Sequence, residues 1–485
     1  MERKGCSLRL FSTIALLSLP LPVIAGSISA PAVVGGVDAS STTVSPVAIH
    51  WNPGALGAST GFDFLMDTQL SVVSVQATAT RNDGIDPNTD EPYRTATAEA
   101  KVPVFVLGMT YRLPESVPWV GDRLTLGLSA MDTFVGGGDY TSSEVDSDGN
   151  PADTPPYTSH QRYAGINTKI ITLKVTPAIG LTLMDGLHIG GGFSYVADII
   201  QAMQASDTIG SEGNGLSPYS NDSILEASGS GSHTTWNAGI FFNRIEQFQV
   251  GLSYSAPGAF NAAGDAKVSV AQLLGGMDVD GLATFDMPLP AVIRGSVASQ
   301  VNSNLKLGAG FEYQLWSNCC GGPEGDLRIG LTDLEGGAID SGEGLTPGFT
   351  IATEQFSPRR LQNSLNLYAT AEYALSDAMV LGSRFGWNQS AVPDYAVSAT
   401  NLDFTSLGGG LSVDYQVAKR LKLGASFTKF IPQTRTITNS AWDATKGTDV
   451  YVDDRFSPSL PNKANTDGVY SAQNNTFGVR LRWTL

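Results

Sequence analysis

The sequence predicts an all-β protein, a transmembrane antiparallel β-barrel of about 14 strands. Segments of roughly ten residues alternate apolar and polar side chains, as strands do when one face meets lipid and the other water. The chain of 485 residues has 54 glycines and only 15% charged residues, a composition poor in helix-stabilising side chains. An export signal precedes these segments, and no later stretch approaches the about 18 apolar residues that a membrane-spanning helix needs.

The amino terminus has the pattern of a secretory signal peptide. Two arginines and a lysine precede the apolar run from Leu10 to Ile24, and the small residue Ala25 suits signal peptidase. We therefore predict a signal peptide over residues 1–25, with cleavage after Ala30 as the alternative. The apolar run is short and broken by two prolines, which argues against a retained anchor helix.

The segment before the first expected strand has the composition of neither a strand nor a linker. Residues 35–59 open on Gly-Gly-Val-Asp-Ala-Ser and lead to Trp51 and then to Asn-Pro-Gly-Ala-Leu at 52–56. Taken alone, 52–56 reads as a turn into the first strand. A compact segment ahead of a wide barrel can also plug it, so we predict an N-terminal hatch over residues 26–60 inside the lumen and a barrel over 61–485.

The expected strands share one repeat of alternating polarity. They lie at 62–76, 101–112, 122–134, 168–183, 187–203, 232–243, 247–269, 283–299, 304–317, 363–375, 378–389, 404–416, 420–433 and 474–485. Short turns alternate with long Gly/Asp/Ser/Pro-rich insertions at 135–165, 206–230, 318–362 and 435–472. Short turns on one rim and long extracellular loops on the other are typical of outer-membrane barrels.

The last strand shows the alternation most clearly. Its apolar positions are Phe477, Val479, Leu481, Trp483 and Leu485. Arg480 and Arg482 fall between them, so we expect both arginines to face a wet interior. By the same parity we expect Leu307 and Leu367 to face lipid and Glu312 to face the lumen. Tyr and Trp near segment ends, Trp316 among them, are expected in the interfacial girdles.

Charge and cysteine content exclude several classes of site. The net charge of −17 leaves no basic footprint for nucleic acid. The acidic segments 82–86 and 146–150 are either hydrated external turns or sites for a divalent cation. Neighbouring Cys319 and Cys320 form either a vicinal disulfide or a pair of loop thiols, and neither arrangement provides a zinc site.

No pattern of catalytic residues is present. The sequence has four histidines, none of them in a Gly-x-Ser-x-Gly elbow or a His-Glu-x-x-His frame. The triple glycines at 190–192 and 408–410 lack a following Lys-Ser or Lys-Thr, so they indicate close packing or kinks rather than phosphate loops. We therefore expect no enzymatic activity, no catalytic residue, no metal site and no cofactor. His50, beside 52–56, is the histidine of most interest.

Several short motifs, in order along the chain, resemble those of the FadL family of outer-membrane long-chain fatty acid and hydrocarbon transporters. They are Asn52-Pro53-Gly54-Ala55-Leu56, Leu252 to Pro257 with Gly264-Asp265-Ala266, Met287 to Pro290, Phe311 to Ser317, Ala371-Glu372-Tyr373 and Val392-Pro393-Asp394. The chain departs from the family pattern at Leu485, where the family usually ends in Phe, and at Ala256, where it usually has serine. The alanine and glycine of the first motif are also exchanged.

The resemblance implies a passive transporter in the bacterial outer membrane, with Asn52, Pro53, Gly54, Ala55 and Leu56 in the hatch that controls ligand passage. Hydrophobic small molecules, fatty acids or hydrocarbons, are the implied ligands, with long-chain fatty acids first. External loops would capture the ligand, and hatch movement would release it through the wall into the membrane. Contacts with outer-membrane lipid, lipopolysaccharide and the barrel assembly machinery are expected, as is a monomer. The alternative is a diffusion porin for polar solutes, which shares the barrel but not the hatch.

Overall fold

A computed structural model gives the architecture of most of the chain. It describes residues 36–37, 39–79, 95–140, 162, 165–207, 222–245, 247–270, 276–321, 327–335, 354–357, 359–399, 401–438, 440 and 466–485. The predicted signal peptide and both acidic segments fall outside the described residues.

The described residues form nineteen strands and four short helices. The first strands are β1 Phe62–Ala79, β2 Thr95–Arg112, β3 Leu124–Asp139, β4 Asn167–Met184, β5 Leu187–Asp207, β6 Asp222–Ile245, β7 Phe248–Ser255, β8 Gly258–Ser269, β9 Asp278–Leu289 and β10 Val292–Gln300. They are followed by β11 Leu305–Gln314, β12 Leu327–Glu335, β13 Glu354–Ser357, β14 Ser364–Ser376, β15 Met379–Asn388, β16 Ser406–Ala418, β17 Leu421–Pro432, β18 Arg435–Ile437 and β19 Gly468–Thr484. The helices are α1 Ala48–Trp51, η2 Pro53–Ala58, α2 Ser317–Cys320 and η7 Asp394–Ala396.

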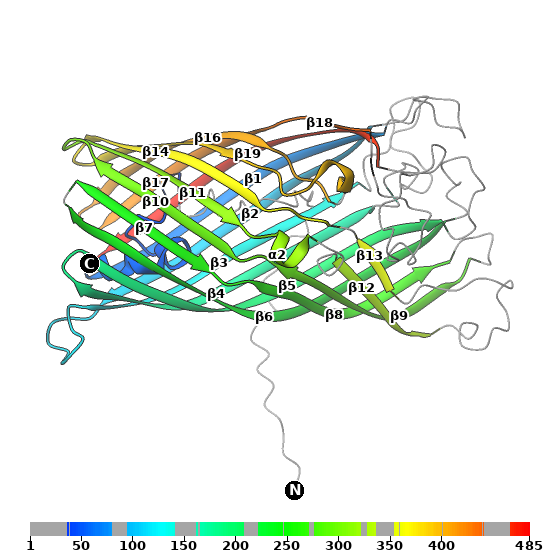
Figure 1. Cartoon of the computed structure of the whole chain (residues 1–485), viewed down its shortest axis with the longest axis horizontal. Coiled ribbons are helices and arrows are strands. Elements are labelled where there is room, and N and C mark those ends of the chain that lie inside the picture. Colours follow the sequence, from blue (N-terminus) through cyan, green and yellow to red (C-terminus); the bar gives the residue numbers. More distant parts are fainter. Residues whose placement is uncertain are drawn as a thin grey trace, which may run out of the picture.

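The strands close into a single antiparallel barrel (Figure 1). Closure comes from β19, which pairs with β1 from Asp63↔Thr484 to Ala79↔Gly468. Five pairs of consecutive strands, β7/β8, β9/β10, β11/β12, β13/β14 and β17/β18, each occupy one position in the wall. The wall therefore has 14 positions, which confirms the predicted fold class.

Two of these breaks occur at prolines. Pro257 lies between β7 and β8, and Pro290 lies between β9 and β10. Proline has no N–H for the ladder, so it interrupts a strand. The sequence predicts one continuous strand at each of these places. It also predicts plain loops at 318–362 and 435–472, where the structure adds α2, β12, β13 and β18.

Exposure follows the predicted parity along the wall. Leu307 and Leu367 are 44% and 45% exposed on the outer face, whereas Glu312 is 5% exposed and faces inward. Tyr111, Tyr254 and Trp483 are exposed, as a girdle requires. The prediction for Trp316 is wrong, because its indole is buried and Nε1 donates to Gln314 Oε1 at 2.8 Å.

No helix within the described ranges is long and apolar enough to cross a membrane.

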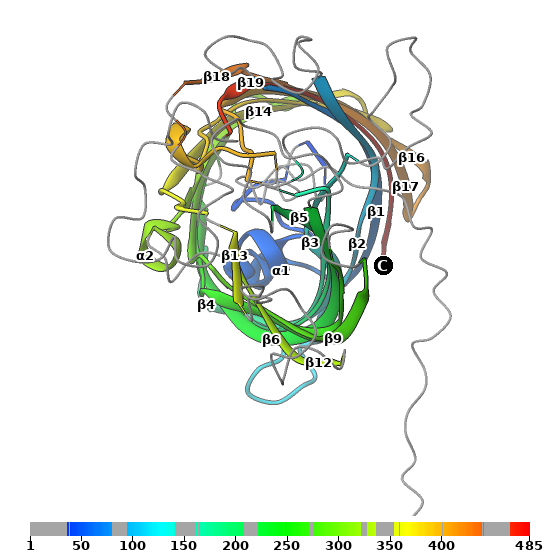
Figure 2. The same ribbon diagram turned by 90° about the vertical axis from the view of Figure 1, so that its right-hand side faces the viewer.

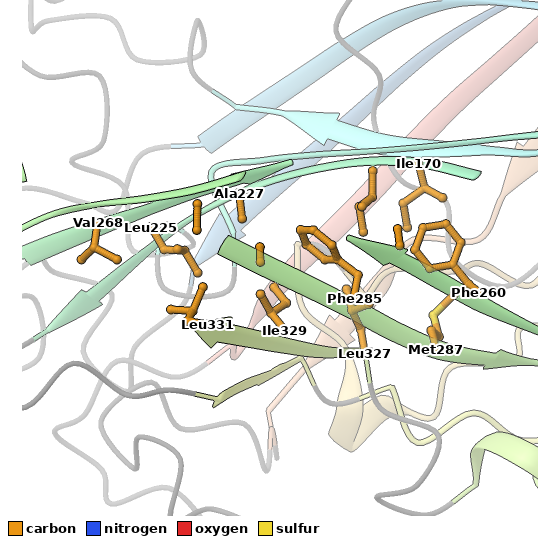
Figure 3. Close-up of a cluster of buried hydrophobic side chains, with 14 of the residues drawn as sticks. Ile170, Leu225, Ala227, Phe260, Val268, Phe285, Met287, Leu327, Ile329 and Leu331 are labelled. Atoms are coloured by element: carbon orange, nitrogen blue, oxygen red, sulfur yellow. The ribbon is translucent and has the colours of Figure 1, made fainter. Parts of the chain in front are cut away.

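The two ends of the barrel differ. The tight turns between β14 and β15 and between β16 and β17 lie at the same end as the carboxyl terminus (Figure 1). Residues 36–37 and 39–58, including α1 and η2, lie inside the bore, as the view along the barrel shows (Figure 2). Toward the opposite end, apolar side chains from β4, β5, β6, β8, β9 and β12 form a buried cluster that includes Leu225, Phe260, Phe285 and Ile329 (Figure 3).

Candidate functional site

The segment at 52–56 begins a short helix within the bore. Asn52 has an extended backbone and caps η2, since its side-chain oxygen accepts from Gly54 N at 3.0 Å. Pro53 follows at the first helical position, where its missing N–H costs no bond. Asn52 through Leu56 are all buried. The asparagine cap and the following proline therefore start a short, compact helix inside the barrel.

Asn52 also ties this helix to its surroundings. Its Nδ2 donates to Ser41 O at 2.8 Å and to Ile240 O on β6 at 3.0 Å. One buried amide thus forms hydrogen bonds with an earlier turn of the hatch, with the start of η2 and with the barrel wall. Each such bond contributes on the order of 1 kcal/mol, and an unmatched buried partner costs more.

Further polar side chains of the wall bind the hatch backbone. Asn237 Nδ2 donates to Ile49 O at 2.7 Å, and Ser253 Oγ donates to Trp51 O at 2.5 Å. Arg384 Nη1 donates to Ala39 O at 2.8 Å. Thr182 and Arg112 both donate to Gly57 O at the end of η2. The hatch is therefore held by hydrogen bonds from β2, β4, β6, β7 and β15.

A ring of wall glycines lets the hatch approach the strands closely. We call this ring the glycine collar; its members are Gly108, Gly127, Gly180, Gly190, Gly239 and Gly251. A Cβ at Gly190 would overlap Pro53 O, and one at Gly239 would overlap Asn52 Oδ1. A Cβ at Gly108 would lie 2.7 Å from Pro46 Cβ. The interpretation of the first triple glycine as a close-packing site agrees with the place of Gly190.

Both arginines of the last strand face the lumen. Arg482 Nη2 lies 2.7 Å from Asp63 Oδ2 and donates to Val44 O at 3.3 Å. Arg480 Nε lies 3.2 Å from Asp67 Oδ2, and its Nη1 lies 3.5 Å from Asp414 Oδ2. These ion pairs bridge the strands that close the barrel, beside the first residues of the hatch.

A small cavity lies between the hatch and the inner faces of β14 to β17. Trp51 lines it from the hatch, and Tyr368, Arg384 and Phe430 line it from the wall. The Arg384 guanidinium carbon lies 3.8 Å from the Tyr368 ring centre and 5.6 Å from that of Trp51. Glu312 also lines the cavity, so its wall combines aromatic faces with charges of both signs.

The ladder between β2 and β3 is incomplete. Their ladder runs from Arg112↔Thr125 to Val106↔Met131 and stops there, although both strands continue. A register shift between Asp132 and Phe134 bends β3 at this point. Asp132 Oδ2 accepts from Phe105 N at 3.2 Å at the edge of the break. Within the described ranges, Thr95 to Val104 of β2 have no ladder partner in β3.

The connection between β15 and β16 folds inward at the other end of the barrel. Ala391, Val397 and Leu402 are buried against side chains of β1 and β19. Asp403 is buried in this connection and accepts from Ala391 N at 2.7 Å, and burial raises its pKa to about 7. Arg435 Nη1 donates to Asp403 O at 2.7 Å. This connection, residues 389–405, is an ordered inner loop.

The remaining predicted residues have definite positions. Cys319 and Cys320 are joined by a disulfide in α2, which resolves the two alternatives that the sequence leaves open. Within the described part of the chain, no group of three or more His, Cys, Asp or Glu could hold a metal ion. Sequence reasoning missed Arg112, Asn237 and Ser253 as partners of the hatch. Each of them is a polar side chain at an inward-facing position of a strand, and the sequence pattern can identify that much.

The comparisons with known proteins agree with this geometry. A family model described as "Outer membrane protein transport protein (OMPP1/FadL/TodX)" matches residues 39–477. No curated protein matches the sequence. The fold is similar to that of a Pseudomonas aeruginosa FadL homologue, with a TM-score of 0.68, 14% identity, and coverage of 96% of this chain and 99% of that one.

Two solved toluene transporters share the fold. The chain is similar to Ralstonia pickettii TbuX, with a TM-score of 0.59, 16% identity and coverage of 94% and 98% of the two chains. It is also similar to Pseudomonas putida TodX, with a TM-score of 0.63, 11% identity and coverage of 96% and 98%. At these identities the likeness establishes the barrel architecture.

Proposed function

Since the chain belongs to the OMPP1/FadL/TodX family of outer membrane transport proteins, we propose that it carries hydrophobic compounds, foremost long-chain fatty acids, passively across the bacterial outer membrane. Membership of this family makes it a transport protein of the outer membrane rather than an enzyme. Contacts with lipopolysaccharide and the assembly machinery, and a monomeric state, stay predictions.

The observation that carries the proposal is the hatch fixed across the bore. Residues 39–58 lie in the lumen, most of them buried, with hydrogen bonds to β2, β4, β6, β7, β15 and β19, and Trp51 lines a cavity beside them. A diffusion porin needs a continuous water-filled lumen, which such a plug interrupts. A hydrophobic ligand needs a dry pocket instead, since it gains about 25 cal/mol for each Å² of apolar surface removed from water.

The break in the ladder between β2 and β3 supports a lateral exit. A hydrophobic ligand that leaves through the wall enters lipid directly and avoids a water-filled channel. The break lies where β3 bends, next to Met131, and Met131 packs in one buried cluster with Trp51 of the hatch. Movement of the hatch would therefore displace side chains at the edge of this break. In this proposal the hatch moves, and its compact centre is formed by Asn52, Pro53, Gly54, Ala55 and Leu56.

Uptake of labelled compounds by cells that lack their own transporter tests the proposal. Expression of the protein should give saturable uptake of palmitate and no uptake of a polar sugar. Uptake of toluene alone would replace fatty acids by aromatic hydrocarbons as ligands. Uptake of the sugar in proportion to its concentration, without saturable palmitate uptake, would establish a porin and overturn the proposal.

A further inference from the structure

The connection between β2 and β3 differs from the tight turns at its end of the barrel. It comprises residues 113–123, whereas β14 and β15, like β16 and β17, are joined by two residues. We call it the β2–β3 turn; its sequence is Leu-Pro-Glu-Ser-Val-Pro-Trp-Val-Gly-Asp-Arg. Short turns mark the periplasmic end of an outer-membrane barrel. A long turn with several apolar residues thus stands where other connections are as short as possible.

Trp119, in the middle of this turn, has an unusual position for a tryptophan. Its side chain is 98% exposed, so it packs against almost nothing within the described residues. Its backbone φ is 73°, in the left-handed region where bulky residues are rarely found. Neither burial nor backbone preference therefore favours a tryptophan here. A strained, exposed aromatic residue of this kind indicates a contact outside the chain.

The β2–β3 turn holds Trp119 on an ordered support. Gly121 N donates to Val117 O at 2.9 Å, which closes the turn around the tryptophan. At its base, Asp122 N donates to Leu113 O at 3.0 Å. Arg112 donates to Asp122 O and also to a hatch carbonyl at the end of η2. The turn is therefore fixed to the rim of the barrel, and the indole is presented outward from it.

The turn projects sideways at the level of the rim. It is the light blue segment at the lower left of Figure 1, and in Figure 2 it lies outside the outline of the wall. Apolar side chains on the neighbouring strand ends are exposed on the outer face, among them Tyr111, Leu126 and Leu183. The lipid-facing surface thus reaches the base of the turn. A segment that extends sideways from this place lies among phospholipid head groups.

We infer that the β2–β3 turn is a membrane contact, which inserts Trp119 into the interface of the periplasmic leaflet and binds phospholipid there. An indole suits this place, because its ring is apolar and its N–H can donate to a lipid ester or phosphate oxygen. The charged residues of the turn are Glu115, Asp122 and Arg123, which nearly cancel. The contact therefore depends on the indole and not on the charge of the lipid.

This inference goes beyond the proposed function, because it concerns the membrane and not the transported compound. The turn joins the two strands whose ladder ends at Val106 and Met131. A turn bound to the leaflet would hold the rim end of both strands at a fixed depth. It would also hold Arg112, which bonds the end of the hatch.

Spin-label accessibility tests the inference in nanodiscs of phosphatidylethanolamine and phosphatidylglycerol. Cys319 and Cys320 are joined in a disulfide, so a nitroxide attaches to the cysteine of Trp119→Cys. We expect this nitroxide to collide severalfold more often with oxygen, relative to a water-soluble Ni(II) chelate, than one at Asp377→Cys. Asp377 is the matched control, since it is exposed in a tight turn at the same end.

Quenching by brominated phospholipids tests the native side chain. We expect them to quench a larger fraction of tryptophan emission in wild type than in Trp119→Phe. The difference should be equal in phosphatidylcholine and phosphatidylglycerol, because the turn carries little net charge. An indole that is 98% exposed supports no packing, so Trp119→Phe should fold as wild type does.

Two results would overturn the membrane contact. One is equal access of the Ni(II) chelate to the labels at 119 and 377, together with quenching unchanged in folded Trp119→Phe. The other is a photo-cross-linker at position 119 that captures a periplasmic protein in cells instead of phospholipid, which would assign the turn to a protein partner. Neither measurement uses palmitate uptake, so the proposed function stands or fails separately.

Discussion

At the residue scale, Asn52 connects the hatch to the wall through three hydrogen bonds of its side chain. Asn52→Ala removes all three and leaves Ile240 O and Ser41 O unmatched, a loss of about 1 kcal/mol per bond. We expect saturable palmitate uptake to fall severalfold, while the amount of folded barrel in the outer membrane changes little. The matched control is Asn261→Ala, because the Asn261 side chain is exposed and bonds only within its own strand, at Ala259 O. Equal uptake in both variants would contradict the role of Asn52.

The glycine collar provides a second test at this scale. A Cβ at Gly190 would overlap the carbonyl of Pro53, a backbone atom, so the hatch must shift in Gly190→Ala. We expect a higher conductance in planar bilayers than wild type shows. Its neighbour Gly191 is the control, since the nearest atom to a Cβ there is Asn237 O at 3.4 Å. An equal conductance of Gly190→Ala and Gly191→Ala would show that the collar does not position the hatch.

The roles of some of these residues can be predicted from the sequence, and the roles of others cannot. Asn52 and Pro53 are visible because a helix cap and the following proline are adjacent in the chain. Asn237 and Ser253 are not, because each bonds a hatch residue more than one hundred positions away. Alternation assigns both side chains to a face of their strands, but it cannot predict which residues lie opposite that face across the lumen.

At the element scale, the bulge in β3 lies where its ladder with β2 ends. The register shift between Asp132 and Phe134 leaves Thr133 as the extra residue of the bulge. Deleting Thr133 should restore an even ladder and let β3 continue along β2. We expect such a barrel to fold and to lose most of its uptake of hydrophobic compounds. Thr133→Ala keeps the residue count and should transport as wild type does; uptake that survives the deletion would place the exit elsewhere.

The inner loop, residues 389–405, carries a pH dependence through Asp403. Burial raises the pKa of this carboxyl to about 7, whereas an unfolded aspartate titrates near about 3.9. The folded loop thus binds the proton more tightly, and this stabilisation is fully present below about pH 4 and is lost as the pH rises through about 7. After correction for intrinsic rates, amide exchange in 390–404 should be slower at pH 6 than at pH 8. The same difference in Asp403→Asn would rule out Asp403 as its source.

The alternation of apolar and polar residues predicts the strands better than it predicts the breaks and loops between them. Alternation predicts each of the fourteen wall positions, because lipid on one face and water on the other enforce a period of two. It does not predict α2, β12 or the inner loop. These segments fold against side chains of distant strands, as Trp316 does, and their own sequences show turn residues without a repeat.

At the scale of the whole molecule, barrel and hatch are separate sources of stability. The strands hydrogen-bond to one another around a closed ring, from β1 to β19 and back. The hatch adds bonds to that ring but completes none of its ladders. The barrel should therefore fold without it, and the bore should then be open.

Conductance of the protein without residues 26–60 tests the central claim most directly. We expect this deletion to leave a heat-resistant barrel in the outer membrane. Its conductance in planar bilayers should rise from near closure to that of an open pore, while saturable palmitate uptake disappears because the pocket floor and the moving part are both lost. A folded barrel whose conductance and palmitate uptake both equal those of the intact protein would contradict the account.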